Sequence, residues 1–276
     1  MGNYLSSPNV EKHTLRNSGN DLLYGLSSMQ GWRTSMEDAH VATYIIPTFP
    51  GASFFAVFDG HGGTLAAEFS AEHIISTLIS QDGFNETLDA DGIGSYMTNC
   101  FLTLDVDMRC IPSMASGDDY SGTTAIASFI TKTHIIVANT GDSRSVIAKK
   151  GAMIPMSFDH KPIDPVEEER IKNAGGMVRN NRVNGDLAVS RALGDFVYKN
   201  RNDLPASSQQ VSPVPDIKIE PRDGSEEFLI IACDGIWDVM SNEEICHIIR
   251  QLLQLGEKDL GLIAEELIDQ CLGLGR

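Results

Sequence analysis

The sequence predicts an α+β fold with antiparallel β-sheets, and three observations lead to this class. Residues 54–58 and 228–232 are apolar runs rich in β-branched and aromatic side chains, which is typical of buried strands. Residues 121–149 contain three short strand-like segments joined by tight turns, as antiparallel neighbours are. The helical segments occur in groups, whereas a parallel sheet would require strict alternation of strands and helices.

Length, charge and cysteine content exclude several classes of protein. The 276 residues suffice for one large domain or two small ones with a sizeable core. The 38 acidic and 21 basic residues give a net charge of −17, which argues against a nucleic-acid binder. The five cysteines are scattered without a C-x-x-C motif, so we expect reduced thiols and a cytoplasmic or nuclear location. Since no apolar run approaches about 18 residues and no secretory signal is recognised, no membrane span is expected.

The first residues carry one targeting pattern. Residues 1–21 are predicted to form a loose polar arm before a domain at 22–276, or to add an edge strand to it. The start MGNYLS matches the M-G-x-x-x-[ST] pattern for myristoylation of Gly2, although an unmodified polar start fits it equally well. A single acyl chain gives only marginal membrane binding, so weak membrane contact is the most that Gly2 predicts.

The expected elements follow from hydrophobic periodicity and from helix-capping residues. Strands are expected at residues 24–29, 39–46, 54–58, 121–130, 133–139, 143–149 and 228–232, with the three between 121 and 149 forming an antiparallel meander. Helices are expected at residues 63–79, 93–108, 165–174, 242–253 and 260–268. Residues 176–215 are rich in Gly, Asn, Ser and Pro, and they predict a mobile surface flap with turns and a short helix.

Aspartates at the ends of buried strands are the candidate metal ligands. Both apolar runs end in Asp-Gly, at Asp59 and at Asp234, and glycine permits a sharp turn with close approach of the backbone to a ligand. One Asp-Gly pair alone is more often a simple turn, but two such strands can converge on one cation. Asp142, Glu37 and Asp38 add carboxylates near other strand ends. Such oxygen ligands suit Mg²⁺ or Mn²⁺ better than zinc.

Two further side chains complete the parts that phosphate-ester hydrolysis needs. Arg33 offers a bidentate fork for phosphate oxygens, and His61 can protonate a departing alkoxide. Two cations that share a carboxylate, roughly 3.5–4 Å apart, can hold a hydroxide for in-line attack on phosphorus. Each residue also has a simpler interpretation, since Arg33 lies in a charged loop and His61 in a glycine-rich turn.

Over residues 22–272 the chain resembles the metal-dependent, type 2C protein serine/threonine phosphatases, the PPM family. Six motifs occur in the family's order, and together they are highly specific although each alone is weak. They are GWR with MEDAH at 31–40, FDGHGG at 58–63, SGTTA at 121–125, ANTGDSR at 138–144, residues 187–195, and ACDGIWD at 232–238.

The resemblance implies two antiparallel sheets packed face to face and flanked by helices. It implies that Asp59 bridges two Mn²⁺ or Mg²⁺ ions and that the Gly60 carbonyl binds one of them. Asp234 would bind the other ion, and Glu37 and Asp38 would hold metal-bound waters.

The resemblance also assigns the remaining roles. Arg33 would bind the substrate phosphate and His61 would act as general acid. Asp142 and Asp238 would serve a weaker third metal, although each of these two also fits a simple turn cap. Phosphorylated proteins are the implied partners, no nucleic acid is expected, and the enzyme is expected to be a monomer.

The chain departs from the family at its C-terminal end. In the family the last helix is followed by a Gly-Ser-x-Asp-Asn motif and a final core strand, whereas this sequence stops at Gly275 and Arg276. We therefore expect a sandwich that lacks the last core strand and one aspartate ligand, with low stability and weak turnover.

Three functions remain open at this point. The first is an active phosphoserine/phosphothreonine phosphatase that works through a Mn- or Mg-bound hydroxide. The second is a catalytically weak or inactive phosphatase-like binding protein, because the C-terminal aspartate is absent. The third, another metal-dependent hydrolase such as a nuclease, is disfavoured by the acidic charge and by the six motifs.

Overall fold

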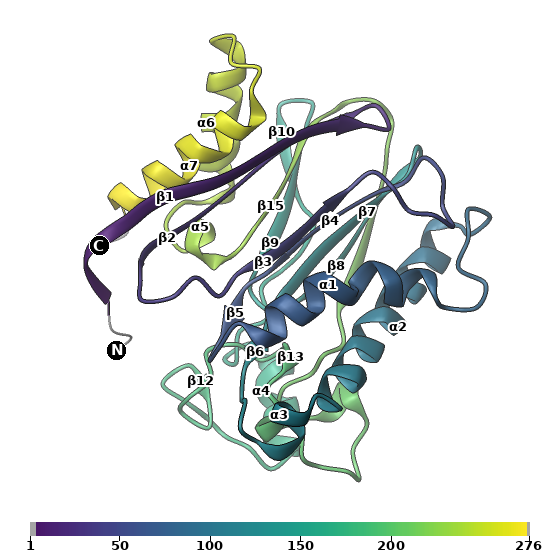
Figure 1. Cartoon of the computed structure of the whole chain (residues 1–276), viewed down its shortest axis with the longest axis vertical. Coiled ribbons are helices and arrows are strands. Elements are labelled where there is room, and N and C mark those ends of the chain that lie inside the picture. The colour runs from purple at the N-terminus through teal and green to yellow at the C-terminus, as the bar shows by residue number, and fades with distance from the viewer. Residues whose placement is uncertain (1–3, 275–276) are drawn as a thin grey trace.

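The fold is built on two antiparallel sheets that stack face to face, with helices on both outer sides. The computed structural model describes residues 4–274 (Figure 1). The larger sheet has five strands, in the order β14 (Asp216–Pro221), β8 (His134–Thr140), β7 (Ala125–Ile130), β4 (Ser53–Phe58) and β3 (Ala39–Thr43). The smaller sheet has the order β10 (Ala152–Pro155), β9 (Arg144–Lys149) and β15 (Glu226–Ala232). Every pair of neighbouring strands within them is antiparallel.

Alternation along the strands fills three apolar layers, because successive side chains point to opposite faces of a sheet. In β7, Phe129 packs toward the helices on the outer face, while Ile126 and Ile130 pack between the two sheets. In β15, Leu229 points into the layer between the sheets and Ile230 points away from it. The predicted α+β fold with antiparallel sheets is thereby confirmed.

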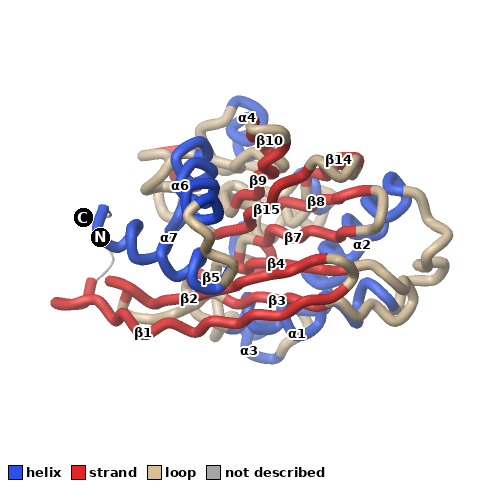
Figure 2. Tube along the Cα trace, turned by 90° about the horizontal axis from the view of Figure 1, so that it is seen from above, coloured by secondary structure: helices blue, strands red, loops and turns tan. Residues whose placement is uncertain are grey.

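Helices cover the two outer faces (Figures 1 and 2). The five-stranded sheet is covered by α1 (Leu65–Ile79) and α2 (Ala90–Arg109), whose apolar faces join its core. The three-stranded sheet is covered by α5 (Asp234–Trp237), α6 (Asn242–Gln254) and α7 (Leu260–Leu274). A capping box begins α6, with the side chains of Ser241 and Glu244 each accepting from the other's backbone N–H. Two short helices, α3 (Pro112–Ser116) and α4 (Pro165–Asn173), lie outside these groups.

The N-terminal residues form a strand rather than a loose arm. β1 (Tyr4–Gly19) pairs with β2 (Leu22–Arg33) in a long hairpin, which forms a two-stranded sheet of its own. β1 lies beside α7 in both views (Figures 1 and 2), and Arg16 contacts Asp259 and Glu265 while Lys12 contacts Asp269. These ion pairs hold β1 against α7, because the side chains of this strand are too polar to form an apolar core. Gly2 lies outside the described residues.

The predicted meander at residues 121–149 was wrong in its third strand. β7 and β8 are neighbours, but β9 pairs with β10 and β15 in the other sheet. The chain crosses from one sheet to the other at Gly141, whose φ of +111° is open to glycine and strained for other residues. Because of this crossing, Asp142 is buried at the end of both sheets instead of lying in an exposed hairpin.

The flap at residues 176–215 has little regular structure but many anchors. It contains the hairpin β11 (Val178–Arg179) with β12 (Arg182–Val183), and two 3₁₀ turns, η1 (Phe196–Tyr198) and η2 (Ala206–Ser208). Its strand β13 (Leu193–Gly194) pairs with β6 (Gly122–Thr123), which pairs in turn with β5 (Gly60–His61). This small sheet ties the flap to the glycine-rich turn after β4.

Two other expectations can be compared with the described residues. All five cysteines are free thiols, as expected. None of the helices within residues 4–274 has the length and apolar character that crossing a bilayer requires. In the same part of the chain β15 pairs with β9 alone and β2 with β1 alone. The absence of a further core strand stays a prediction.

Candidate functional site

Two aspartates from the two different sheets meet at one end of the sandwich. Asp59 follows β4 of the five-stranded sheet, and Asp234 begins α5 directly after β15 of the three-stranded sheet. Desolvation, followed by the charges of Asp38, Asp234 and Asp142, raises the pKa of Asp59 to about 9. Desolvation and the charges of Asp142 and Asp238 raise the pKa of Asp234 to about 6. The sequence therefore folds so that like charges gather at a partly buried point.

The charges of Asp38 and Asp142 both act on Asp59, and that of Asp142 acts on Asp234 as well. Desolvation raises the pKa of Asp38, while a hydrogen bond with Cys233 and the charge of Arg33 oppose that rise. Asp142 is buried, and its Oδ2 lies 2.6 Å from Nζ of Lys161, which was not among the predicted site residues. Lys161 is the described ion-pair partner of Asp142, and no salt bridge with a basic side chain occurs within residues 4–274 for Asp38, Asp59 or Asp234.

The remaining predicted ligands lie around the same point. The backbone of Gly60 runs so close to Glu37 that an added Cβ would lie 2.3 Å from the Glu37 carbonyl oxygen. Glu37 Oε1 accepts a hydrogen bond from Ser35 Oγ at 2.8 Å. Asp238 is exposed one turn after Asp234, and its backbone N–H donates to the Asp234 carbonyl oxygen at 2.8 Å. Its charge acts on Asp234, as the raised pKa shows.

The carboxylate and carbonyl oxygens are of the kind that hard divalent cations prefer. The side chains are not, however, arranged around one common centre. Within residues 4–274 no group of three or more His, Cys, Asp or Glu side chains is arranged as a formed metal site. The mutual repulsion of Asp59, Asp234, Asp38 and Asp142 is nevertheless what a cation would relieve, and oxygen donors suit Mg²⁺ and Mn²⁺. The charge of the Glu37 carboxyl also acts on Asp38.

Arg33 and His61 lie on different elements, and the side chains of both are near the carboxylates. Arg33 ends β2 and is exposed, with no salt bridge among the described residues, so its guanidinium is free to meet an anion. Its charge acts on Asp38. His61 lies in β5, two residues after Asp59, and its side chain is 29% exposed.

His61 has a partner that the sequence analysis did not single out. His61 Nε2 lies 2.7 Å from Asp195 Oδ2, and the Asp195 side chain is only 4% exposed. Desolvation lowers the pKa of His61, but the charge and hydrogen bond of Asp195 outweigh it and raise the pKa overall. The two residues are 134 positions apart, and the signal available in the sequence was only that Asp195 ends one of the six motifs.

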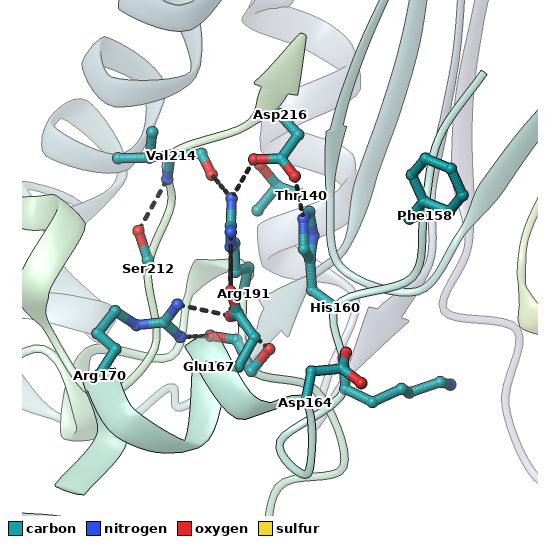
Figure 3. A network of polar contacts seen from close by, with 12 residues as sticks. Thr140, Phe158, His160, Asp164, Glu167, Arg170, Arg191, Ser212, Val214 and Asp216 are labelled. Atoms are coloured by element: carbon teal, nitrogen blue, oxygen red, sulfur yellow. Dashed lines mark hydrogen bonds and ion pairs between the residues drawn. The ribbon is translucent and has the colours of Figure 1, made fainter. Parts of the chain in front are cut away.

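A polar network joins the flap to α4, to β14 and to the loop after β10 (Figure 3). Arg191 donates to Glu167 Oε1 at 2.7 Å and to Asp216 Oδ1 at 2.7 Å. Asp216 Oδ2 accepts from His160 Nε2 at 3.1 Å, and His160 Nδ1 accepts from the Gly141 N–H at 3.1 Å. The sequence analysis missed this network, because its members come from α4, the flap, β14 and the loop after β10.

Comparisons with known proteins agree with this geometry. A family model described as "Protein phosphatase 2C" matches residues 22–276. Protein phosphatase 1A of Homo sapiens is 43% identical over 280 residues, covering 100% of this chain and 73% of that protein. Protein phosphatase 1B of Mus musculus is 43% identical over 287 residues, with the same two coverages.

Solved structures share the fold at lower sequence identity. The serine-threonine phosphatase 2C from Toxoplasma gondii superposes with a TM-score of 0.76 at 22% identity, covering 98% of this chain and 92% of that chain. A sex determining protein of C. elegans superposes with a TM-score of 0.74 at 23% identity, covering 98% of this chain and 62% of that chain. At these identities the two structures speak for the fold alone, whereas the family model and the 43% identical relatives carry the assignment. This chain therefore belongs to the protein phosphatase 2C family and is a homologue of the type 2C serine/threonine phosphatases.

Proposed function

We propose that this protein is a Mn²⁺- or Mg²⁺-dependent phosphatase that hydrolyses phosphoserine and phosphothreonine in phosphorylated proteins. The observation that carries the proposal is the convergence of Asp59 and Asp234 from two sheets, beside Asp38 and Asp142, without enough basic side chains to balance them. Such a cluster costs stability unless a cation binds, so its presence favours a function that uses one.

Each side chain then has a role that its position allows. Asp59, the Gly60 carbonyl and Asp234 would hold two cations, with Glu37 and Asp38 supporting them through water. Asp142 and Asp238 would serve a weaker third cation. What such cations supply when bound is Lewis acidity toward water and the phosphoryl oxygens.

The protein's own groups would orient the substrate and move the proton. The exposed Arg33 fork would hold two phosphoryl oxygens of the phosphate monoester. His61, partly exposed beside Asp59, would give a proton to the departing serine or threonine oxygen. The substrate would be a phosphorylated segment of a protein, which is what membership of a protein phosphatase family supports.

Release of inorganic phosphate from a phosphothreonine peptide, with and without Mn²⁺, tests the proposal. We expect turnover that requires Mn²⁺ and is lost on Asp59→Asn and Asp234→Asn. Arg33→Ala should mainly raise KM. His61→Gln should lower kcat by roughly 10²–10⁴-fold on the peptide and less on p-nitrophenyl phosphate, whose leaving group needs no protonation.

The same experiment separates the alternatives. Tight Mn²⁺ binding without turnover would favour the phosphatase-like binding protein, and the arrangement of the carboxylates, which is not closed around a point, is the observation in its favour. Mn²⁺-dependent cleavage of a nucleic acid without release of phosphate from the peptide would favour a nuclease. Full activity in Asp59→Asn would contradict the proposed cation-dependent mechanism.

A further inference from the structure

We infer that Asp195 is the positioning residue of His61: it orients the imidazole and fixes which ring nitrogen carries the proton. The inference rests on the proposed function, because it gives His61 a defined direction of proton transfer. It goes beyond that function by giving the flap a part in the reaction.

The contact itself is short, sheltered and directional. Asp195 Oδ2 lies 2.7 Å from His61 Nε2, and the carboxylate is 4% exposed while the imidazole is 29% exposed. A carboxylate only accepts, so Nε2 must donate its hydrogen to Asp195. The other ring nitrogen, Nδ1, has no hydrogen-bond partner within residues 4–274 and is left to exchange a proton with a substrate.

Glycine at position 122 keeps the space for this contact. An added Cβ on Gly122 would lie 2.2 Å from Asp195 Oδ2 and 2.6 Å from His61 Nε2. Both distances are shorter than any real Cβ contact, so only glycine permits the two side chains to meet there. β6, which contains Gly122, pairs with the strand of His61 on one side and with β13 of the flap on the other.

The backbone around Asp195 is fixed from the helical side. Asp105, on α2, accepts from the Gly194 N–H at 2.9 Å and from Lys199 Nζ at 2.5 Å. Lys199 also donates to the Ala192 carbonyl oxygen at 2.8 Å, and its side chain is 2% exposed. Asp105 thus holds the backbone directly before Asp195 and the side chain of Lys199 shortly after it. The loop that carries Asp195 cannot shift without breaking this buried ion pair.

The other end of the same segment is fixed by the network in Figure 3. Arg191 lies four residues before Asp195 and is held by Glu167 of α4 and by Asp216 of β14. The backbone N–H of Asp195 donates to the Ser121 carbonyl oxygen at 3.2 Å. With Arg191 and Lys199 both anchored, the segment between them holds one carboxylate against one imidazole.

Asparagine is the substitution that isolates this role. Asp195 has φ of +53°, in the left-handed region, which Asn tolerates better than most residues. Asp195→Asn therefore keeps the backbone and the size of the side chain but can now donate to the ring nitrogen. The matched control is Asp203→Asn in the same flap, because exposed Asp203 pairs with Arg201 and does not touch His61.

The first measurement is the protonation pattern of the His61 ring, which does not require activity. Long-range ¹H–¹⁵N correlation spectra of the metal-free protein at a pH where the ring is neutral should show the proton on Nε2. Asp195→Asn should move the proton to Nδ1 or mix the two forms, whereas Asp203→Asn should leave the spectrum as in the original protein. A neutral ring protonated on Nδ1 in the original protein, or an unchanged spectrum in Asp195→Asn, would overturn the inference.

The second measurement is turnover with Mn²⁺ on two leaving groups. Asp195→Asn should lower kcat on a phosphothreonine peptide by about 10²-fold, at the lower end of what a general acid contributes, with KM little changed. The loss on p-nitrophenyl phosphate should be much smaller. In a His61→Gln background, Asp195→Asn should cost nothing further, because a residue that acts only through His61 has nothing left to position.

An equal loss on both substrates, or an additive loss in the double variant, would assign Asp195 a merely structural role. A chain without any phosphatase activity would contradict the proposed function instead. In that case the ring spectrum alone would decide whether Asp195 positions His61.

Discussion

Asp59 shows at the scale of one residue how a binding site lowers the stability of the empty protein. Its carboxyl is desolvated and faces Asp38, Asp234 and Asp142, so the charged form is disfavoured and its pKa is raised to about 9. When folding raises the pKa of a carboxyl group, the fold is at its most stable below the ordinary pKa of that group. It loses stability as the pH rises from there toward the folded-state pKa. At neutral pH the empty cluster therefore works against folding.

Asp59→Asn is expected to raise the melting temperature of the metal-free protein at pH 7, because a neutral amide avoids the cost of keeping a buried carboxyl group protonated at that pH. A relief of about 1 kcal/mol would appear as about 2–4 °C for a domain of this size. Calorimetry of both proteins after treatment with a chelator would measure it. The exposed Asp82, whose side chain has no described ion pair, provides the control Asp82→Asn, and a lower melting temperature in Asp59→Asn alone would refute the argument.

At the scale of elements, the α4–flap junction depends on a single carboxylate. Desolvation would raise the pKa of Glu167, but hydrogen bonds from Arg191 and the charges of Arg170 and Arg191 outweigh it and hold the pKa at about 2. The folded-state pKa lies below the ordinary glutamate pKa of 4.5, so the stabilisation is complete above a pH of about 4.5. It is lost as the pH falls toward about 2.

Glu167→Gln should abolish that acid-sensitive part of the stability. It should also lower the free energy of unfolding at pH 7 by about 3 kcal/mol, since two partly buried arginines lose their carboxylate. Urea unfolding at a series of pH values between about 2 and 7 would measure both effects. The neighbouring Glu168→Gln serves as control, because Glu168 is only partly buried and pairs only with Lys172 among the described residues. The same pH slope in Glu167→Gln and the unaltered protein would rule out the assignment.

The contact of α7 with β2 makes a second prediction at this scale. A Cβ on Gly25 would lie 2.0 Å from the Leu260 carbonyl carbon and 2.2 Å from the Gly261 nitrogen, so Gly25→Ala must push α7 away. We expect a loss of about 1–3 kcal/mol, the usual cost of overpacking. Gly273→Ala in the same helix meets no atom within 4 Å and should be neutral or stabilising. Thermal melts of the two variants that moved in the same direction would show that α7 is not packed on β2 as described.

How far the sequence predicts this molecule depends on the range of the interactions. The strands that carry Asp59 and Asp234 were predictable because alternation and apolar content are local properties of the chain. In β14, Ile217 and Ile219 alternate with charged residues, as in a strand with one buried face. This strand was missed because the pattern is short and directly follows the Pro-rich flap. The crossing at Gly141 was missed because a tight turn has the same sequence signature whether it joins two neighbouring strands of one sheet or two strands of different sheets.

The sequence predicts which residues form the site, but not which of them contact one another. The motifs supplied the aspartates, Arg33 and His61 as types of residue suited to the chemistry. No spacing in the sequence pairs His61 with Asp195 or Lys161 with Asp142, because those contacts depend on how the flap and the Gly141 turn fold. Long-range polar contacts of this kind need the structure.

At the scale of the whole molecule, cation binding and folding should be linked. A cation that binds only the folded form stabilises it by about 2.7 kcal/mol at a concentration 100 times its Kd. We expect Mn²⁺ to raise the melting temperature by about 5–10 °C, and a chelator to reverse the rise. Calorimetry over a Mn²⁺ titration would measure it. Asp234→Asn should reduce the shift strongly, and an equal shift in that variant would mean that Mn²⁺ binds elsewhere on this acidic surface.

The ion pairs between β1 and α7 have a consequence for how the chain is made. Arg16 and Asp259 are 243 positions apart, so a ribosome that adds roughly 5–20 residues per second presents β1 about 10–50 seconds before α7. During that interval the hairpin of β1 and β2 leaves the exit tunnel without the helix that covers it. This hairpin is thus synthesised long before the helix that shelters it. A slow stretch of translation between the two, or a chaperone that holds extended chains, would act on the hairpin during that interval.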